Sequence, residues 1–146
     1  MAAKSRKADD EALIRAVIDD VTKAIRAKDA DGVIKHHADD FVHFSLAPPL
    51  QAAADARSLE AWFATWRGTI GYETRDLSIV AGSDVAFCHS LNRMSGVMTD
   101  GEPTDLWFRL TVGLRKVEGA WKIVHEHESV PFYMDGSMRA ATDLKP

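Results

Sequence analysis

Cysteine is almost absent from this sequence: Cys88 is the only one among 146 residues. An intrachain disulfide and a CxxC-type site are therefore excluded, and we expect Cys88 to be a small buried residue. No segment approaches the run of about 20 apolar residues that a membrane helix needs. Residues 1–7 carry charges but no apolar stretch, which is not the pattern of a signal peptide. We therefore expect a cytoplasmic protein.

A basic face is missing as well. The net charge is −4, and lysine and arginine are scattered along the chain with acidic residues nearby. Nucleic-acid-binding proteins normally show a clustered basic patch, so we expect neither a nucleic acid nor a membrane as partner. The motifs G-x-G-x-x-G, G-x-S-x-G, H-E-x-x-H and the phosphate loop are also absent, which removes the enzyme classes that they mark. We expect no cofactor.

The first half of the chain shows helical spacing. Residues 9–27 predict an amphipathic helix with a stripe of aliphatic side chains. Asp29 can cap a second short helix that runs to about His37. A strand at residues 41–45 and a surface loop at 46–57 follow, and Ser58 can cap a third helix that ends near Gly68. The apolar stripe of the third helix is Leu59, Trp62, Phe63 and Trp66.

The second half reads as strands joined by short turns. The strands span residues 72–81, 85–98, 106–117 and 120–130, and glycine-containing turns separate them. Helices followed by a meander predict an α+β fold, a cone of three helices on a strongly curved, mostly antiparallel sheet. We expect one domain over residues 1–146, with 1–8 and 132–146 as tails. The concave face of the sheet is the expected place for a pocket.

The final strand carries a family resemblance. Residues 119–131 resemble the last strand of SnoaL-like proteins of the NTF2-like superfamily, which carry the pattern G-x-W-x-I-x-H-x-H-x-S. The strand at residues 107–111 resembles the R-x-T strand of the same family. The segment is also similar to the association domain of calcium/calmodulin-dependent kinase II. The resemblance implies the NTF2-like (cystatin-like) cone, and Asn92 falls near a position where the kinase association domain places a pocket arginine.

Strand periodicity divides the last strand into two faces. It places Trp121 and Ile123 together with His125, His127 and Ser129, and this face resembles the wall of a pocket. The opposite face carries Lys122, Val124, Glu126 and Glu128 and can simply be wet.

The hairpin at Glu118 and Gly119 leaves two registers open. A two-residue turn pairs Leu110 with His127, whereas a three-residue turn with Gly119 as a bulge pairs Arg109 with His127. We favour the second, because it gathers Trp107, Arg109 and Thr111 with the histidines and matches the family pattern. It leaves an apolar stripe on the other face of that strand, which we expect a second subunit to cover in a homodimer. The stripe is Leu106, Phe108, Leu110, Val112 and Leu114.

Arg109, His125 and His127 are the predicted catalytic residues. An imidazole titrates near neutrality and can move a proton or bind an anion, and a guanidinium can hold an oxyanion. Each also has a structural interpretation, as a hydrogen-bonded histidine or an ion-pair partner, and an H-x-H metal site lacks an evident third ligand. Asp40 is the expected counter-charge. The predicted ligand-binding residues are His43, Ser45, Trp62, Trp66, Asn92, Trp107 and Ser129.

Two family mechanisms fit the sequence poorly. Ketosteroid isomerases use carboxylic acids at positions that match Ser45 and Gly113 here, and limonene-epoxide-hydrolase relatives flank their arginine with two aspartates that are not apparent. We therefore expect a small-molecule-binding protein that acts on a polar or aromatic metabolite by histidine and arginine acid–base chemistry. A non-catalytic ligand-binding or dimerisation module and a pathway accessory protein remain the alternatives.

Overall fold

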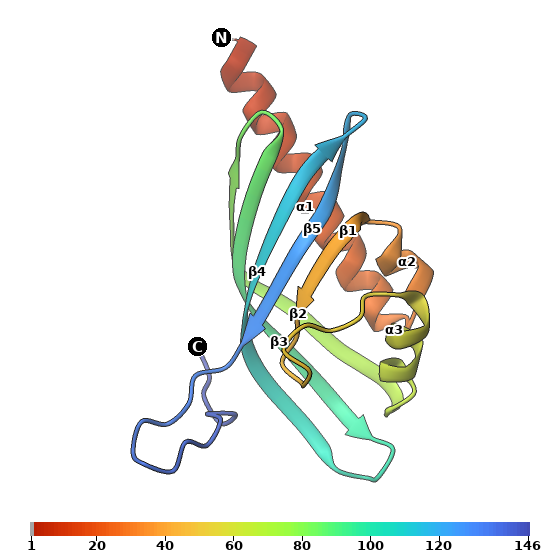
Figure 1. Cartoon of the computed structure of the whole chain (residues 1–146), viewed down its shortest axis with the longest axis vertical. Coiled ribbons are helices and arrows are strands. Elements are labelled where there is room, and N and C mark those ends of the chain that lie inside the picture. Colours follow the sequence, from red (N-terminus) through yellow and green to blue (C-terminus); the bar gives the residue numbers. More distant parts are fainter. Residues whose placement is uncertain (1) are drawn as a thin grey trace.

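The strands form one curved sheet. The computed structural model describes residues 2–146, and the sheet is built from β1 (His37–Phe44), β2 (Trp66–Ala81), β3 (Val85–Met98), β4 (Pro103–Val117) and β5 (Ala120–Ser129). Their order is β1-β5-β4-β3-β2; β1 runs parallel to β5, and the other neighbours are antiparallel. The helices lie against one side of this sheet (Figure 1). The predicted α+β cone is confirmed.

Helix α1 (Ala2–Arg26) begins earlier than its amphipathic stripe. The structure places residues 2–8, which we expected to be a tail, in this helix. Ile14, Ile18 and Val21 of α1 are buried against the sheet, which is what their i, i+4, i+7 spacing predicts. Asp29 caps α2 (Ala30–Ile34), and its carboxylate accepts a hydrogen bond from the Gly32 amide at 3.0 Å.

Helix α3 (Ala56–Phe63) is shorter than predicted. Its cap is Asp55, whose carboxylate accepts a hydrogen bond from the Ser58 amide at 2.7 Å, whereas Ser58 was the predicted cap. Trp66 begins β2, and Gly68 adopts a positive φ of 68° inside that strand. The spacing from Phe63 to Trp66 fits a helical stripe, but Trp66 and Ile70 pack on Phe63 from a strand just as well. The burial of Trp66 therefore does not by itself show whether this residue lies in a helix or in a strand.

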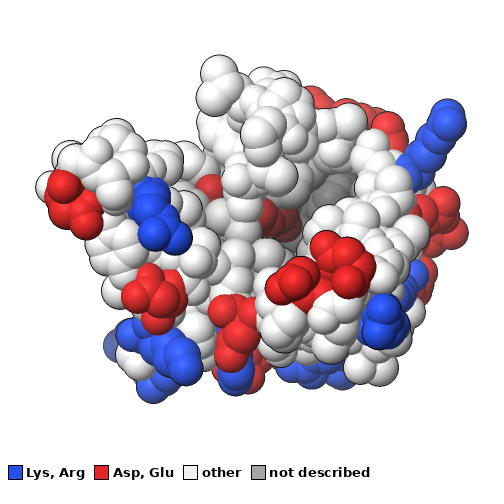
Figure 2. All heavy atoms as spheres, turned by 90° about the horizontal axis from the view of Figure 1, so that it is seen from below, with Lys and Arg blue, Asp and Glu red and all other residues white. Residues whose placement is uncertain are grey.

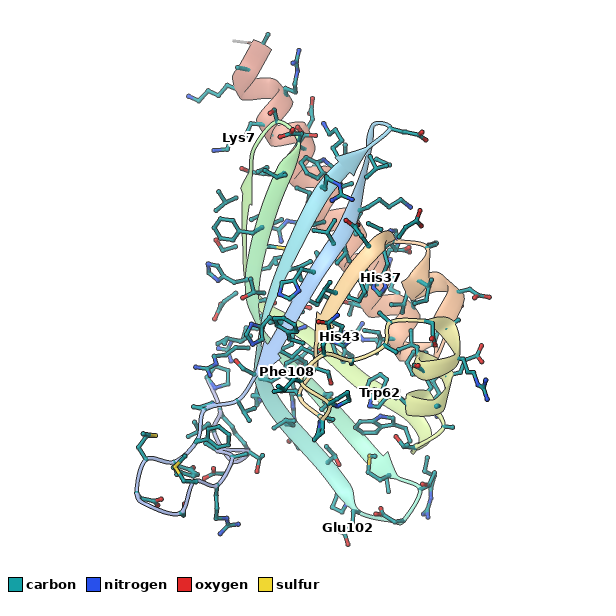
Figure 3. All side chains as sticks on the ribbon, in the orientation of Figure 1. Lys7, His37, His43, Trp62, Glu102 and Phe108 are labelled. Carbon is teal, nitrogen blue, oxygen red and sulfur yellow. The ribbon has the colours of Figure 1, made fainter. Side chains whose placement is uncertain are left out.

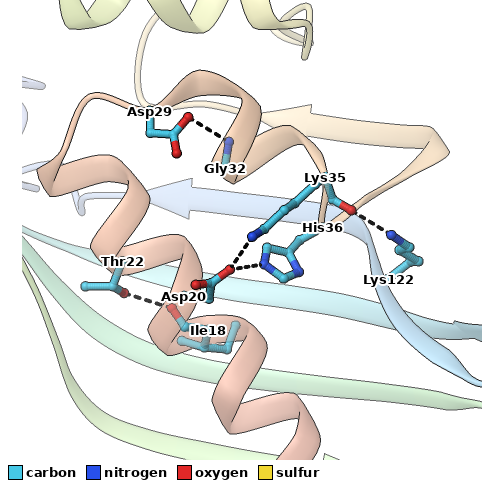
Figure 4. A network of polar contacts seen from close by, with 8 residues as sticks. All are labelled: Ile18, Asp20, Thr22, Asp29, Gly32, Lys35, His36 and Lys122. Atoms are coloured by element: carbon cyan, nitrogen blue, oxygen red, sulfur yellow. Dashed lines mark hydrogen bonds and ion pairs between the residues drawn. The ribbon is translucent and has the colours of Figure 1, made fainter.

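A polar network ties α1 and α2 to the sheet (Figure 4). The Asp20 carboxylate lies 2.6 Å from His36 Nε2 and 3.1 Å from Lys35 Nζ. The Lys122 ammonium of β5 donates a hydrogen bond to the Lys35 carbonyl at 2.6 Å. These contacts fix the chain where α2 ends and β1 enters the sheet.

The inward stripe of β4 is covered by the chain itself. Phe108, Leu110, Val112 and Leu114 are buried in one cluster with α1, and Leu106 packs against it. The prediction that a second subunit covers these residues is wrong, because the helices already do. Exposed apolar side chains of the sheet, among them Phe44 and Phe87, lie outside this cluster. A homodimer stays a prediction, without that stripe as its interface.

The chain leaves the sheet after β5. Residues 130–146, predicted in large part as a tail, form a loop that stands away from the sheet (Figure 1) and closes on itself through an isolated bridge between Phe132 and Ala140. Ala141 is buried. Among the residues described, none of the helices has both the length and the apolar character needed to cross a membrane.

Candidate functional site

The hairpin between β4 and β5 decides which side chains face the helices. Its turn has two residues, because Val117 pairs with Ala120, and both Glu118 and Gly119 adopt positive φ angles, as a type I′ turn requires. The predicted three-residue turn is therefore wrong. The extra residue lies further along β5, where Leu114 pairs with Ile123 but Gly113 pairs with His125. Val124 is thus a bulge.

This bulge exchanges the two faces of β5. Trp121 and Ile123, before it, are buried in the core. A bulge adds one residue to the strand and breaks the period of two, so the side chains that follow Ile123 inward are Glu126 and Glu128. The predicted common face of Trp121, Ile123, His125, His127 and Ser129 does not exist. The glutamates predicted to be wet line the interior.

The three predicted catalytic residues lie outside the cavity. Arg109 and His127 do share a face, as predicted, and Arg109 Nε donates a hydrogen bond to Ser129 Oγ at 3.1 Å. This face is the one turned away from the helices, however. His125 Nδ1 lies 2.8 Å from the Val42 carbonyl, and the ring of Phe44 packs edge-on against both His125 and His127. The prediction that Arg109, His125 and His127 converge in the pocket is therefore wrong.

A cavity of about 570 Å³ lies between the three helices and the inner face of the sheet. Seen from below, the molecule is hollowed near its middle, with acidic atoms visible inside the recess (Figure 2). Its wall is mainly apolar, and Trp62 on α3 and Phe108 on β4 are part of it (Figure 3). The loop at residues 45–55 closes one side. The polar side chains of its wall include His37, His43, Tyr72, Asn92, Glu126 and Glu128.

His43 and Glu128 form the ion pair of the cavity. His43 Nε2 lies 3.3 Å from Glu128 Oε1, across the parallel pairing of β1 and β5. Burial disfavours the imidazolium, but the hydrogen bond to Glu128 and the negative charges of Glu128 and Glu126 outweigh it and raise the pKa of His43. Burial, and then the charge of Glu128, raise the pKa of Glu126 to about 7. Glu126 therefore titrates near neutrality, and His43 binds its proton more tightly than an ordinary histidine does.

A neutral hydrogen-bond chain lies beside these charges. Ser90 Oγ donates to Asn92 Oδ1 at 2.6 Å, and Asn92 Nδ2 donates to Tyr72 Oη at 3.1 Å. The amide thus fills an acceptor position of Tyr72 and leaves the phenolic proton free to point into the cavity. Burial raises the pKa of Tyr72 well above its ordinary value, so the phenol stays protonated. Asn92 itself is 1% exposed.

His37 is a second imidazole of the wall. Its ring stacks on Phe41 with centroids 3.9 Å apart, and neither of its buried ring nitrogens has a hydrogen-bond partner among the described residues. Burial, followed by the nearby His43, lowers the pKa of His37 to about 4. His37 is therefore neutral wherever His43 can exchange a proton.

Four of the seven predicted ligand-binding residues line the cavity: His43, Ser45, Trp62 and Asn92. Trp66 is instead buried in the smaller core cluster. Trp107 lies outside the cavity, where the guanidinium groups of Arg75 and Arg93 each lie 5.9 Å from the centroid of its ring. Ser129 accepts a hydrogen bond from Arg109. These three do not line the cavity as predicted.

Asp40, the predicted counter-charge, lies outside the cavity too. It is exposed and pairs with Arg115, with Asp40 Oδ1 2.9 Å from Arg115 Nη2.

Glu126 and Glu128 line the cavity but were not predicted to do so. Strand periodicity could not have revealed them, because the bulge at Val124 reverses the two faces of β5. The alternation of acid and histidine along residues 125–128 shows only that one of the two sets must face inward.

The donor atoms of His43, Glu126 and Glu128 lie within 4.8 Å of one another. Atoms so placed could hold a metal ion: three protein donors are the number in a catalytic zinc site, whereas a structural zinc site has four. The contact between His43 and Glu128 already gives two of these three side chains a polar partner. The arrangement as it stands is an acid–base cluster at the polar end of an apolar cavity, the usual composition of a small-molecule site.

Comparison with known proteins agrees with this architecture. The family model of the SnoaL-like domain matches residues 14–133, so the chain belongs to the SnoaL-like family. An NTF2-like protein of unknown function from Pseudomonas putida KT2440 is similar to it over 98% of both chains, with 33% identity and a TM-score of 0.83. The predicted family resemblance is confirmed. A search of curated proteins finds no match.

More distant structures share the fold. A candidate scytalone dehydratase from Novosphingobium aromaticivorans is 18% identical over 95% of both chains, with a TM-score of 0.79. The association domain of calcium/calmodulin-dependent kinase II from C. elegans is 18% identical, with a TM-score of 0.62; the match covers 86% of this chain and 96% of that one. At this identity, the likeness concerns the fold alone.

Proposed function

We propose that this chain is a cofactor-independent enzyme of the dehydratase or isomerase class, which moves a proton at a carbon atom next to a carbonyl group of a ring-bearing metabolite. The observation that carries the proposal is the His43–Glu128 pair, 3.3 Å apart, inside a mainly apolar cavity of about 570 Å³. Such a cavity has room for a ring system, and in the pair Glu128 orients the imidazole that accepts the proton and stabilises its protonated form.

His43 is the proposed proton carrier. A general acid–base group works best when its pKa lies near the working pH, and the contacts of His43 raise its pKa from the ordinary value for histidine. Glu128 holds the ring in one orientation and stabilises the imidazolium that forms when His43 accepts a proton. The neutral ring is the base, so the rate of proton abstraction falls as the pH drops below the pKa of His43.

Tyr72 is the proposed partner of the carbonyl oxygen. Removing a proton beside a carbonyl places negative charge on that oxygen, and a fixed, neutral donor stabilises it in a dry site. The bond from Asn92 to Tyr72 Oη, itself fixed by Ser90, holds the phenol in place. Because its pKa is raised, Tyr72 keeps its proton and can donate a hydrogen bond to the carbonyl oxygen.

A dehydration would use the same groups in sequence. His43 takes the proton from the carbon next to the carbonyl, and the enolate oxygen is held by Tyr72. The enolate then reforms the carbonyl and a carbon–carbon double bond, and the hydroxyl group on the next carbon leaves. That hydroxyl receives the proton from His43 and departs as water. The shared fold of the candidate scytalone dehydratase supports this class.

Hydrogen–deuterium exchange tests the proposal without knowledge of the natural substrate. Ring ketones such as 2-tetralone are incubated with the protein in D2O, and deuterium uptake beside the carbonyl is followed by NMR. We expect protein-dependent uptake that falls at least tenfold in both His43→Gln and Glu128→Gln. His127→Gln, on the opposite face of β5, is the matched control and should exchange like the unaltered chain.

Two results would contradict the proposal. Uptake that is unchanged in His43→Gln would show that another group moves the proton. Binding of the ketones without any protein-dependent uptake would instead favour the non-catalytic ligand-binding module.

A further inference from the structure

The charged side chains that line the cavity are mainly acidic. Among the described residues, no lysine or arginine lines it, while Asp55, Glu126 and Glu128 do. Asp55 is committed to the cap of α3, and Glu128 is paired with His43. His37 is neutral, because its pKa is about 4. The carboxylate of Glu126 is thus the charge that the cavity leaves unbalanced.

Glu126 is half-buried in the cavity wall and lacks the contacts that usually accompany a carboxylate removed from water. No hydrogen bond to its side chain occurs among the described residues, and its nearest charged neighbours are Glu128, which repels it, and the already paired His43. Glu126 and Glu128 are two residues apart on one strand and point into the same cavity. Burying a carboxylate without a partner is unfavourable, so a cation placed between the two glutamates would be bound strongly.

The wall next to the glutamates also suits an organic cation. Phe41, Trp62, Tyr72 and Phe108 line the cavity, and the faces of aromatic rings attract ammonium groups as well as apolar rings. An inorganic cation would use the carboxylates but leave this apolar wall empty. A ligand that joins a ring to a basic nitrogen uses both.

We propose that the cavity selects ring-bearing ligands that carry a protonated amine, with the ammonium group held by Glu126 and Glu128, and that it rejects carboxylates. This inference rests on the proposed function in one respect, that the same cavity binds the substrate. It assigns Glu126 to recognition and leaves proton transfer to His43. The predicted site of Arg109, His125 and His127 favoured an anionic ligand, whereas the cavity favours a cationic one.

Three indane ligands of nearly equal size separate the alternatives. 2-Aminoindane carries an ammonium group, 2-indanol is neutral and indane-2-carboxylic acid is an anion. Binding is measured by isothermal titration calorimetry at pH 8, where Glu126 is ionised because its pKa is about 7. We expect the amine to bind at least tenfold more tightly than the alcohol, and the carboxylate at least tenfold more weakly than the alcohol.

The variant Glu126→Gln tests whether Glu126 causes the preference for the ammonium ligand. It should lower the affinity for 2-aminoindane at least tenfold, to the level of the alcohol, and leave the affinity for 2-indanol unchanged. Glu118→Gln removes an exposed glutamate of the β4–β5 turn and should change neither affinity, which controls for net charge.

The inference is overturned if the alcohol or the carboxylate binds as tightly as the amine, if none of the three ligands binds, or if Glu126→Gln leaves the preference intact. Such results would not touch the proposed function, because proton exchange on ring ketones is measured separately and depends on His43. Conversely, a preference for the amine without any ketone exchange would support the cation site and contradict the catalytic proposal.

Discussion

Glu126→Gln should stabilise the folded chain at pH 8 by about 2 kcal/mol, although the substitution removes a charged group. Burial and the charge of Glu128 raise the pKa of Glu126 from 4.5 to about 7. One pKa unit corresponds to about 1.4 kcal/mol, and water that enters the cavity reduces the full effect. Few single substitutions stabilise a protein this much.

The pH dependence of this gain has a definite sign. The folded chain keeps a proton on Glu126 up to about pH 7, whereas the unfolded chain loses it near pH 4.5. The contribution of this proton to stability is complete below pH 4.5 and is lost as the pH rises through 7. The advantage of Glu126→Gln should therefore be absent at pH 4.5 and complete at pH 8.

Urea denaturation at both pH values measures the difference in the free energy of unfolding. Glu118→Gln, at an exposed turn position, should have no such pH-dependent effect. A Glu126→Gln variant that is less stable than the unaltered chain at pH 8 would mean that the carboxylate has a partner after all.

Ile123→Ala should lower the free energy of unfolding by about 3 kcal/mol. Ile123 is 0% exposed and packs in the main core cluster, and removing most of a buried isoleucine leaves a cavity that costs about 2–5 kcal/mol. His125 lies two residues further along β5, but the bulge at Val124 turns it to the other face. His125→Ala should therefore cost less than about 1 kcal/mol.

The contrast between these two variants is the informative quantity. In a regular strand, residues 123 and 125 share a face, and both substitutions would then disturb the core to a similar degree. Equal losses in urea denaturation would contradict the bulge. A large loss for Ile123→Ala alone would support it.

Much of the fold was readable in the sequence. The aliphatic spacing of α1 and the glycine-containing turns between the strands predict elements that the structure confirms, because burial imposes one period on helices and another on strands. The boundaries of α3 were less readable, since Trp66 packs on Phe63 from a strand as it would from a helix.

The candidate site was only partly readable. His43 and Asn92 line the cavity, as predicted, because each lies on the inward face of a strand whose periodicity holds there. The glutamates were missed because one extra residue, Val124, reverses the faces of β5. Nothing local in the sequence marks that bulge. It follows from how β5 fits between β1 and β4, which is a property of the assembled sheet.

An NMR titration of the Glu126 side-chain carboxyl carbon, assigned by its loss in Glu126→Gln, tests most directly whether β5 turns its glutamates into the cavity. We predict a titration midpoint near pH 7, since burial and the charge of Glu128 both oppose ionisation. A midpoint near 4.5, the ordinary value for a glutamate in water, would show that Glu126 faces the solvent and would contradict the site described above.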